Sequence, residues 1–184
     1  MMLHLGCGKR YIQGFIHVDL ADWPHIDYRN SVDDLSMFED SSADLIYSSH
    51  VFEYFDRQKA PSVLAEWRRV LISGGILRLA VPDFQALVQV YAESGDLNKI
   101  LGPLFGRIMV ESGDSEIQHI YHRTVYDYFS LKSMLEENGF IDIRKYNWRK
   151  TLHKDYDDYS QAYYPHMEKE KGLLISLNLE AKKG

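Results

Sequence analysis

The stretch that decides the fold opens the chain, where residues 3–8 are LHLGCG and residues 14–19 are GFIHVD. Each segment contains a short apolar run typical of a buried strand, and the first run leads directly into Gly6 and Gly8. Glycine directly after a strand lets the backbone approach a ligand closely. Asp19 ends the second run, and its carboxylate can accept both hydroxyl protons of a ribose. The stretch predicts a nucleoside-binding edge at the carboxyl ends of two strands, the alternative being a tight turn with a surface carboxylate.

The spacing within this stretch favours a cofactor without phosphates. A dinucleotide fingerprint has a third glycine, a full helix, and an acidic residue about 20 positions further on. Here no third glycine follows three residues after Gly8, and Asp19 comes only thirteen residues after Gly6. Residues 6–14 alone separate the two strands, although a parallel crossover usually takes about 10–12 residues or more. We therefore expect the glycine loop itself, with a helical turn at most, to make this crossover.

Short apolar runs alternate with helical patterns along the rest of the chain, which predicts a mostly parallel sheet. Further strands are expected at residues 26–29, 44–49, 76–81, 140–148 and 173–179. Helices are expected at residues 57–71, 84–91 and 131–138, the first of them ended by Gly74 and Gly75. In the second helix, Phe84, Leu87, Val88 and Tyr91 are expected to lie on one face. No helical pattern separates the last two strands, so a hairpin is expected to make the final strand antiparallel.

Composition excludes some classes of protein. The chain has 184 residues, a net charge of −6 and no Lys/Arg block longer than a pair, which argues against a nucleic-acid partner. No apolar run is long enough to span a membrane, which takes about 18 residues or more. The first residues lack the pattern of a signal peptide, and the single cysteine, Cys7, suits a reducing compartment. These features predict one cytoplasmic domain over residues 1–184 without a membrane partner, and they leave a homodimer open.

Several segments, taken in order, resemble the class I S-adenosylmethionine-dependent methyltransferases, and among them the methyltransferase type 11-like group. The matching segments are residues 3–8, 14–19, 32–35, 43–53, 67–77, 81–84, 122–123 and 135–140. The resemblance implies a doubly wound, Rossmann-like α/β sheet of seven mostly parallel strands in the order 3-2-1-4-5-7-6, with the last strand antiparallel. It also implies S-adenosyl-L-methionine as the cofactor and methyl transfer to a small-molecule or glycan-precursor acceptor.

The resemblance assigns roles to residues at the carboxyl ends of the strands. Gly6 and Gly8 would line the methionine and ribose, and Asp19 would hold the ribose hydroxyls. Asp34 and Leu35 occupy the positions at which the family contacts adenine. The complete cofactor-binding set implied in this way is Leu5, Gly6, Cys7, Gly8, Asp19, Leu20, Asp34, Leu35, Ser49 and His50. Ser49 and His50 would face the sulfonium, whereas the acidic residue that usually precedes the first glycine is replaced here by His4 or Leu5.

Methyl transfer requires a nucleophile held about 3 Å from the methyl group, and an alcohol acceptor also requires a base. His50 is the first candidate base because it follows the fourth strand, and His122 is the second. Asp83, after the fifth strand, could position a hydroxyl or amine of the acceptor. The structural alternatives are that His50 caps the turn that follows it and that Asp83 is the N-cap of the next helix.

Glu53 could pair with Arg57 one helical turn further on, as a solvated ion pair. His119 and His122, three residues apart, could ligate a metal, but no third ligand has a clear spacing, so no metal is expected.

Two long connections are expected to carry function, a cap or insert at residues 95–129 and a loop at residues 149–171. Both are rich in aromatic and polar side chains, which suits a sugar or another ring-bearing acceptor; an interface or a packed flap is the alternative. Two other functions compete with methyl transfer. A catalytically silent cofactor-binding module is one. An NAD(P)-dependent oxidoreductase is the other, disfavoured by the glycine spacing.

Overall fold

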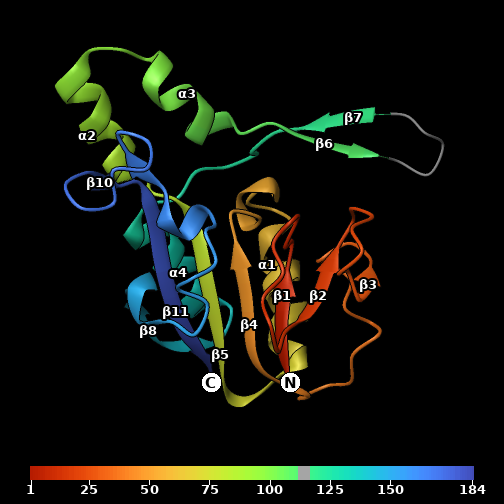
Figure 1. Cartoon of the computed structure of the whole chain (residues 1–184). Coiled ribbons are helices and arrows are strands. Elements are labelled where there is room, and N and C mark those ends of the chain that lie inside the picture. Colours follow the sequence, from red (N-terminus) through yellow and green to blue (C-terminus); the bar gives the residue numbers. More distant parts are fainter. Residues whose placement is uncertain (112–116) are drawn as a thin grey trace.

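The computed structural model describes residues 1–111 and 117–184. Its main sheet has seven strands in the order β3-β2-β1-β4-β5-β11-β8, and β11 is antiparallel to both of its neighbours (Figure 1). With β8 and β11 counted as the sixth and seventh strands of this sheet, the expected order 3-2-1-4-5-7-6 is confirmed. The strands are β1 (Met2–Leu5), β2 (Ile16–Asp19), β3 (Tyr28–Arg29), β4 (Ala43–Ser49), β5 (Leu71–Pro82), β8 (Phe140–Lys145) and β11 (Ser176–Lys183).

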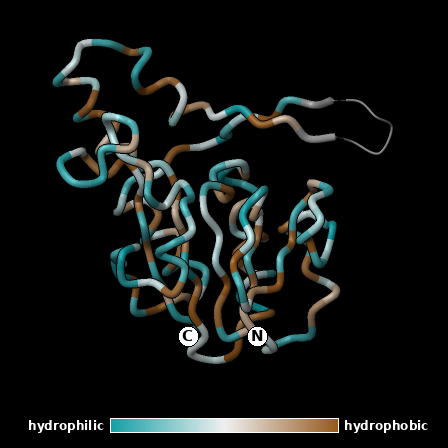
Figure 2. The backbone as a smooth tube through the Cα atoms, in the orientation of Figure 1, coloured by the Kyte–Doolittle hydropathy of each residue, from teal (hydrophilic) through white to brown (hydrophobic). Residues whose placement is uncertain are grey.

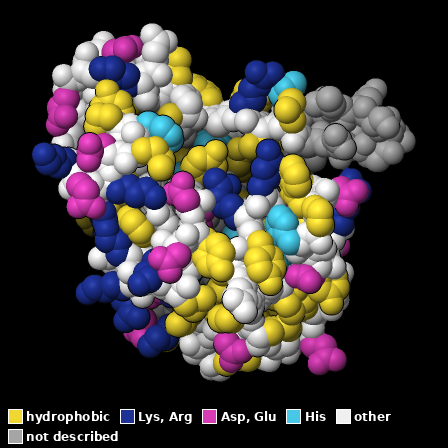
Figure 3. Space-filling model, viewed as in Figure 1, with side chains coloured by type: hydrophobic (Ala, Val, Ile, Leu, Met, Phe, Trp, Pro, Cys, Tyr) yellow, Lys and Arg dark blue, Asp and Glu magenta, His cyan; other side chains and the backbone are white. Residues whose placement is uncertain are grey.

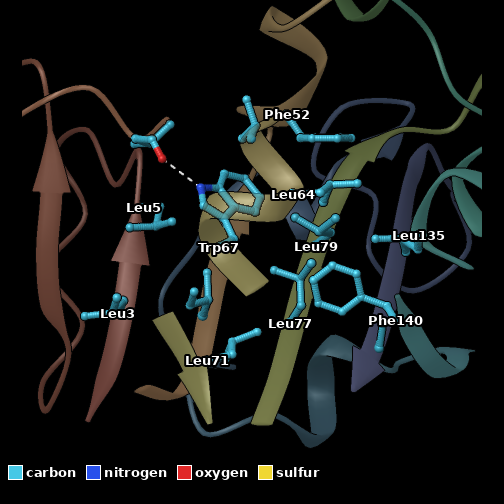
Figure 4. Close-up of a cluster of buried hydrophobic side chains, with 14 of the residues drawn as sticks. Leu3, Leu5, Phe52, Leu64, Trp67, Leu71, Leu77, Leu79, Leu135 and Phe140 are labelled. Carbon is cyan, nitrogen blue, oxygen red and sulfur yellow. Dashed lines mark hydrogen bonds between the residues drawn. The ribbon is translucent and has the colours of Figure 1, made fainter. Parts of the chain in front are cut away.

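Two helices, α1 (Ala60–Val70) and α4 (Tyr128–Glu137), cover one face of this sheet. Trp67 lies at the centre of the core between α1 and the strands, and its indole Nε1 donates to the carbonyl of Val32 at 2.7 Å (Figure 4). Alternate strand residues such as Leu3 and Leu5 point to this face and are fully buried. Since side chains alternate across a strand, the residue between them, His4, points to the opposite face.

The opposite face is covered by the loop of residues 148–161 instead of a layer of helices. Its two short 3-10 turns are η2 (Trp148–Lys150) and η3 (Tyr159–Gln161). The ring of His153 stacks on Tyr47 of β4 with centroids 4.0 Å apart, and the Tyr47 hydroxyl donates to Asp158. No helix covers this face because the short crossovers at residues 6–15, 20–27 and 30–42 contain none that could pack there. The expectation that the glycine loop makes the first crossover is thus confirmed.

One expectation about local structure is wrong. Gly74 and Gly75 do not end a helix; α1 ends at Val70, and the glycines lie inside β5, beside a register shift in its pairing with β4. Gly74 has a φ of +73°, which permits this irregularity.

The helix expected at residues 84–91 is α2 (Phe84–Ser94). Of the four residues named for its apolar face, only Leu87 lies in the core, whereas Phe84, Val88 and Tyr91 are exposed. Ala86 and Val90 are buried beside Leu87.

The insert lies above the carboxyl ends of the strands (Figure 1). After α2 come α3 (Asn98–Phe105) and the antiparallel hairpin of β6 (Ile108–Glu111) and β7 (Ile117–Ile120). The residues that join the two strands of this hairpin lie outside the described part. A second small hairpin pairs β9 (Tyr163–Tyr164), within the 149–171 loop, with β10 (Leu173–Leu174), just after it. A last turn, η1 (Phe52–Tyr54), follows β4.

The hydrophobic segments of the chain concentrate along the central strands, and the connections above them are more hydrophilic (Figure 2). In the described ranges, no helix combines the length and the apolar character needed to cross a membrane.

Candidate cofactor and acceptor site

The glycine loop joins β1 to β2 at the carboxyl edge of the sheet. Gly6 has a φ of +66° and Gly8 a φ of +54°, in the left-handed region that favours glycine. A Cβ built on Gly6 would lie 2.3 Å from Cγ2 of Val51, which follows the neighbouring strand β4, whereas one built on Gly8 would meet nothing within 4 Å. Gly6 therefore keeps the loop tight against the end of β4, and Gly8 leaves open space in front of it.

Replacing Gly6 with alanine should lower the free energy of unfolding more than replacing Gly8. Both variants incur the left-handed strain of about 1–2 kcal/mol. Only Gly6→Ala also forces Val51 to move. Urea denaturation of the two variants measures the difference. Combining Gly6→Ala with Val51→Ala should recover most of the excess, and a Gly8→Ala loss equal to that of Gly6→Ala would contradict the contact.

Asp19 holds the loop from the end of β2. Its Oδ2 accepts from the backbone N–H of Gly8 at 2.7 Å, and its Oδ1 accepts from the N–H of Ala21 at 2.8 Å. A carboxylate oxygen has room for a second donor, so each oxygen can also accept from a hydroxyl. Cys7 is buried, and burial together with the charge of Asp19 raises the pKa of its thiol to about 12. It is therefore a neutral, small side chain, and its place beside a bound cofactor stays a prediction; Leu5 is fully buried.

The expected adenine position lies beside an open hollow of about 480 Å³ lined by Asp33, Asp34, Ser36, Glu66 and Arg69. Asp34 is exposed there. Leu35 is fully buried, its N–H donates to Glu66 at 2.9 Å, and its carbonyl accepts from Arg69 at 3.0 Å. Both backbone polar groups of Leu35 are thus engaged within the fold. They bond to Glu66 and Arg69, two residues that line the hollow. A contact of Asp34 with adenine stays a prediction, as does one of Leu20, which is 44% exposed beside Asp19.

His50 lies at the end of β4 with a φ of +54°, and its side chain turns inward. Its Nε2 lies 3.0 Å from Oγ of Ser176, and its Nδ1 lies 3.5 Å from Oε1 of Glu53. Burial lowers the pKa of His50 to about 3, and charges on His122 and Arg10 act in the same direction. The imidazole is therefore neutral near pH 7, so it has one nitrogen free to accept a proton. Ser49, beside it, has a buried hydroxyl.

The structure brings His122 to the same place from the far end of the insert. Its Nε2 lies 3.6 Å from Oε1 of Glu53, and its Nδ1 lies 3.1 Å and 3.2 Å from the carbonyls of Pro103 and Leu104. Because a carbonyl can only accept, Nδ1 carries the proton and Nε2 the lone pair. Burial lowers the pKa of His122, and burial raises the pKa of Glu53 to about 8.

Glu53 is the residue that sequence reasoning missed. The expected ion pair with Arg57 is wrong, because Arg57 donates instead to Thr124 and to the carbonyl of Val125. Glu53 is fully buried between the two histidines, whereas an exposed partner for Arg57 would have to face solvent. The sequence contains one signal for the burial of Glu53: an acidic residue stands three positions after His50 within an otherwise apolar run.

Asp83 and His119 lie apart from this cluster in the contacts of the described residues. Asp83 is the N-cap of α2, and its carboxylate accepts from the backbone N–H groups of Gln85 and Ala86. The structure thus shows Asp83 in the capping role that the sequence offered as an alternative. His119 is exposed, and its Nε2 lies 2.8 Å from Arg107. Over residues 1–111 and 117–184, no three His, Cys, Asp or Glu side chains are arranged to hold a metal ion.

The loop of residues 149–171 reaches the mouth of the site. Tyr159 lies over His50, with ring centroids 5.4 Å apart, and the guanidinium of Arg10 lies 4.9 Å from the centre of the Tyr159 ring. Arg10 also donates from Nε to the carbonyl of Asp157, which ties this loop to the glycine loop. On this face of the molecule, basic, histidine and hydrophobic side chains gather below the projecting hairpin (Figure 3). The arrangement shields His50 from water and presents an aromatic, positively charged rim.

Comparison with known proteins agrees with this geometry. Residues 17–79, about a third of the chain, match the family model described as a methyltransferase domain. Among curated proteins, none matches the chain.

Solved structures share the fold over nearly the whole chain. A SAM-dependent methyltransferase from Methanosarcina mazei is 17% identical, with a TM-score of 0.55 and coverage of 99% of this chain and 91% of that one. One from Archaeoglobus fulgidus is 16% identical, with a TM-score of 0.55 and coverage of 99% and 85%. The 1,6-didemethyltoxoflavin-N1-methyltransferase of Burkholderia thailandensis, solved with S-adenosylhomocysteine, is 12% identical, with a TM-score of 0.53 and coverage of 99% and 70%. The chain thus has the fold of these S-adenosylmethionine-dependent methyltransferases, and its segment 17–79 matches a methyltransferase domain model.

Proposed function

We propose that this protein is an S-adenosylmethionine-dependent methyltransferase that acts on a small, ring-bearing acceptor, glycan precursors included. The observation that supports this proposal most is that the glycine loop and a histidine cluster lie next to each other at one edge of the sheet. Gly6, Gly8 and Asp19 form a compact ribose-binding loop, and His50 with His122 forms a buried basic cluster beside it. The Burkholderia methyltransferase was solved with bound 1,6-didemethyltoxoflavin as well as S-adenosylhomocysteine, which agrees with a small acceptor here.

The residues present fit this cofactor. The open space in front of Gly8 and the remaining acceptor capacity of Asp19 are what a ribose with two free hydroxyls needs. When bound, S-adenosylmethionine supplies a methyl group already activated by its sulfonium. The protein then has three tasks: Asp19 fixes the ribose, Tyr159 and Arg10 exclude water, and a ring lone pair of the candidate base, His50 or His122, takes the acceptor's proton.

The insert serves as a cap in this proposal. The base of its β6–β7 hairpin is closed where the N–H of His122 donates to the carbonyl of Phe105 at 2.7 Å. Gly106, with a φ of +50°, leaves the space that the His122 ring occupies. The cap therefore brings one of the two candidate bases into the site, and an acceptor would bind between the cap and the 149–171 loop.

Calorimetry with four ligands tests the proposal. S-adenosylmethionine and S-adenosylhomocysteine should bind, whereas NAD and NADP should not, because the short loop offers no helix N-terminus for a pyrophosphate. Failure of both sulfur compounds to bind a folded protein would overturn it.

A cofactor-binding module without catalysis is the second candidate, and the low pKa of His50 favours it because a base of pKa about 3 is weak. Release of S-adenosylhomocysteine with a panel of hydroxylated and heterocyclic acceptors distinguishes the two functions.

A further inference from the structure

Glu53 poses a physical problem that the fold alone does not solve. Its side chain is 0% exposed, and neither carboxyl oxygen has a hydrogen-bond partner in the part of the chain that the structure describes. Its nearest ring nitrogens are Nδ1 of His50 at 3.5 Å and Nε2 of His122 at 3.6 Å. An ionised carboxylate buried without a partner is costly, so the protein must either protonate it or place a positive charge beside it.

The protonation states of the neighbours limit the choices. His122 has its proton on Nδ1, toward the carbonyls of Pro103 and Leu104, and offers a lone pair to Glu53. His50 faces Glu53 with Nδ1 and Ser176 with Nε2. The Ser176 hydroxyl donates its proton to Oδ1 of Asn178 at 2.9 Å, so it can only accept from Nε2 of His50, and Nδ1 of His50 carries the lone pair. Two ring lone pairs therefore face Glu53, and one proton on its carboxyl group can serve both without burying a charge.

The backbone of the same residue fixes the cap. The carbonyl of Glu53 accepts from the N–H of Arg123 at 2.9 Å and from that of Thr124 at 3.4 Å, directly after His122. The ring of Tyr54 packs edge-on against His122, with centroids 4.7 Å apart. Glu53 and its neighbour thus hold the cap-side histidine at a defined place relative to β4.

We propose, resting on the function proposed above, that Glu53 is a positioning residue that shares one proton with Nδ1 of His50 and Nε2 of His122. The shared proton orients both rings and joins the cap to the end of β4, beside the place where the acceptor would bind.

The other titratable groups around Glu53 are tyrosines and distant cations. Tyr54 on η1 and Tyr126 before α4 have pKa values raised by burial and by the charge of Glu53, so both stay neutral near pH 8. Arg57 lies 5.4 Å from the Tyr126 ring, and Arg10 is on the far side of Tyr159. A titration of the cluster near pH 8 is therefore assigned to the carboxyl of Glu53, whose pKa burial raises to about 8.

Histidine-selective NMR tests the proposal without any acceptor. In the wild-type protein, the ring signals of both His50 and His122 should change together with one inflection near pH 8. In Glu53→Gln, which keeps the shape but cannot ionise, that inflection should vanish. The control Glu136→Gln, on the exposed side of α4, should keep it. No inflection between about pH 7 and 9 in the wild type, or an unchanged one in Glu53→Gln, would overturn the proposal.

A second measurement tests the proposal even if the Glu53→Gln variant does not fold. Wild-type protein labelled with ¹³C at glutamate carboxyls should show one carboxyl titrating near pH 8, far above the others. If every carboxyl titrates below about pH 6, Glu53 does not hold the shared proton. Calorimetry with S-adenosylhomocysteine on the same sample separates this result from the cofactor proposal, since the cluster can titrate as described even if the cofactor does not bind.

Discussion

Asp19→Ala should weaken the binding of S-adenosylhomocysteine by at least about 10²-fold. Each hydrogen bond from a ribose hydroxyl to a carboxylate contributes about 1.5–3 kcal/mol, and the carboxylate makes two of them in the proposed complex. The substitution also removes the acceptor for the N–H groups of Gly8 and Ala21, which hold the loop in its binding shape. The loss therefore combines missing contacts with a loop that must be ordered on binding.

Titration calorimetry of three variants makes this prediction specific. Asp22→Ala, whose side chain is 81% exposed in an ion pair with Arg29, should bind like the wild type. His50→Ala should change the affinity only a few-fold, because its ring faces Ser176 and Glu53. Asp19→Asn should fall between wild type and Asp19→Ala, since the amide keeps one acceptor oxygen. Wild-type affinity in Asp19→Ala would show that the cofactor binds elsewhere.

The sheet order was implied by the resemblance, whereas the antiparallel last strand and the helix-free first crossover could be predicted from the lengths and patterns of the connecting segments. Residues 6–14 are too few to cross over through a full helix, and residues 149–171 contain no helical pattern, so the last strand returns antiparallel. Both arguments use only distances that any chain must obey.

The sequence does not predict in the same way which face of a helix is buried. On α2, the stripe of Phe84, Val88 and Tyr91 has helical spacing, but α3 and Ile175 pack against the neighbouring stripe that contains Ala86 and Val90. Periodicity identifies an apolar stripe, and tertiary neighbours decide whether it is covered.

The site residues also differ in whether the sequence alone could predict them. His50 and Asp19 follow strand ends, and parallel strands place their carboxyl ends together, so both could be named from the sequence. Glu53 could not, because a glutamate four residues before Arg57 is typical of a solvated pair. Its burial depends on the return of His122 from the insert, about 70 residues further along the chain.

The second face of the sheet is unusual in its buried histidines. His4 and His153 are at most 1% exposed, and neither ring nitrogen of His153 has a partner in the described ranges. Burial lowers the pKa of His153 to about 3, with the charge of Arg78 acting in the same direction, and burial also lowers that of His4. The loop of residues 148–161 therefore packs on β4 through a neutral imidazole, and acid should loosen it.

His153→Phe should make the protein markedly less sensitive to acid. An unfolded histidine has a pKa of about 6.5, so below that pH the unfolded chain binds a proton that the folded protein excludes. The free energy of unfolding then falls with pH by about 1.4 kcal/mol per unit for this one group, and keeps falling until the folded pKa of about 3. This contribution is fully present above pH 6.5 and is lost below it. Between pH 6.5 and 4.5 the variant should lose about 2.3 kcal/mol less than the wild type.

Phenylalanine is the matched replacement because the stacking on Tyr47 at 4.0 Å needs a flat ring and because neither ring nitrogen makes a hydrogen bond that would be lost. At pH 7.5 the variant should therefore be about as stable as the wild type. Urea denaturation at a series of pH values, followed by tryptophan fluorescence, gives the slope, and His166→Phe on the exposed surface should leave it unchanged. Equal slopes for His153→Phe and wild type would mean that the ring of His153 is protonated inside the folded protein. Its place against Tyr47 would then have to open to water.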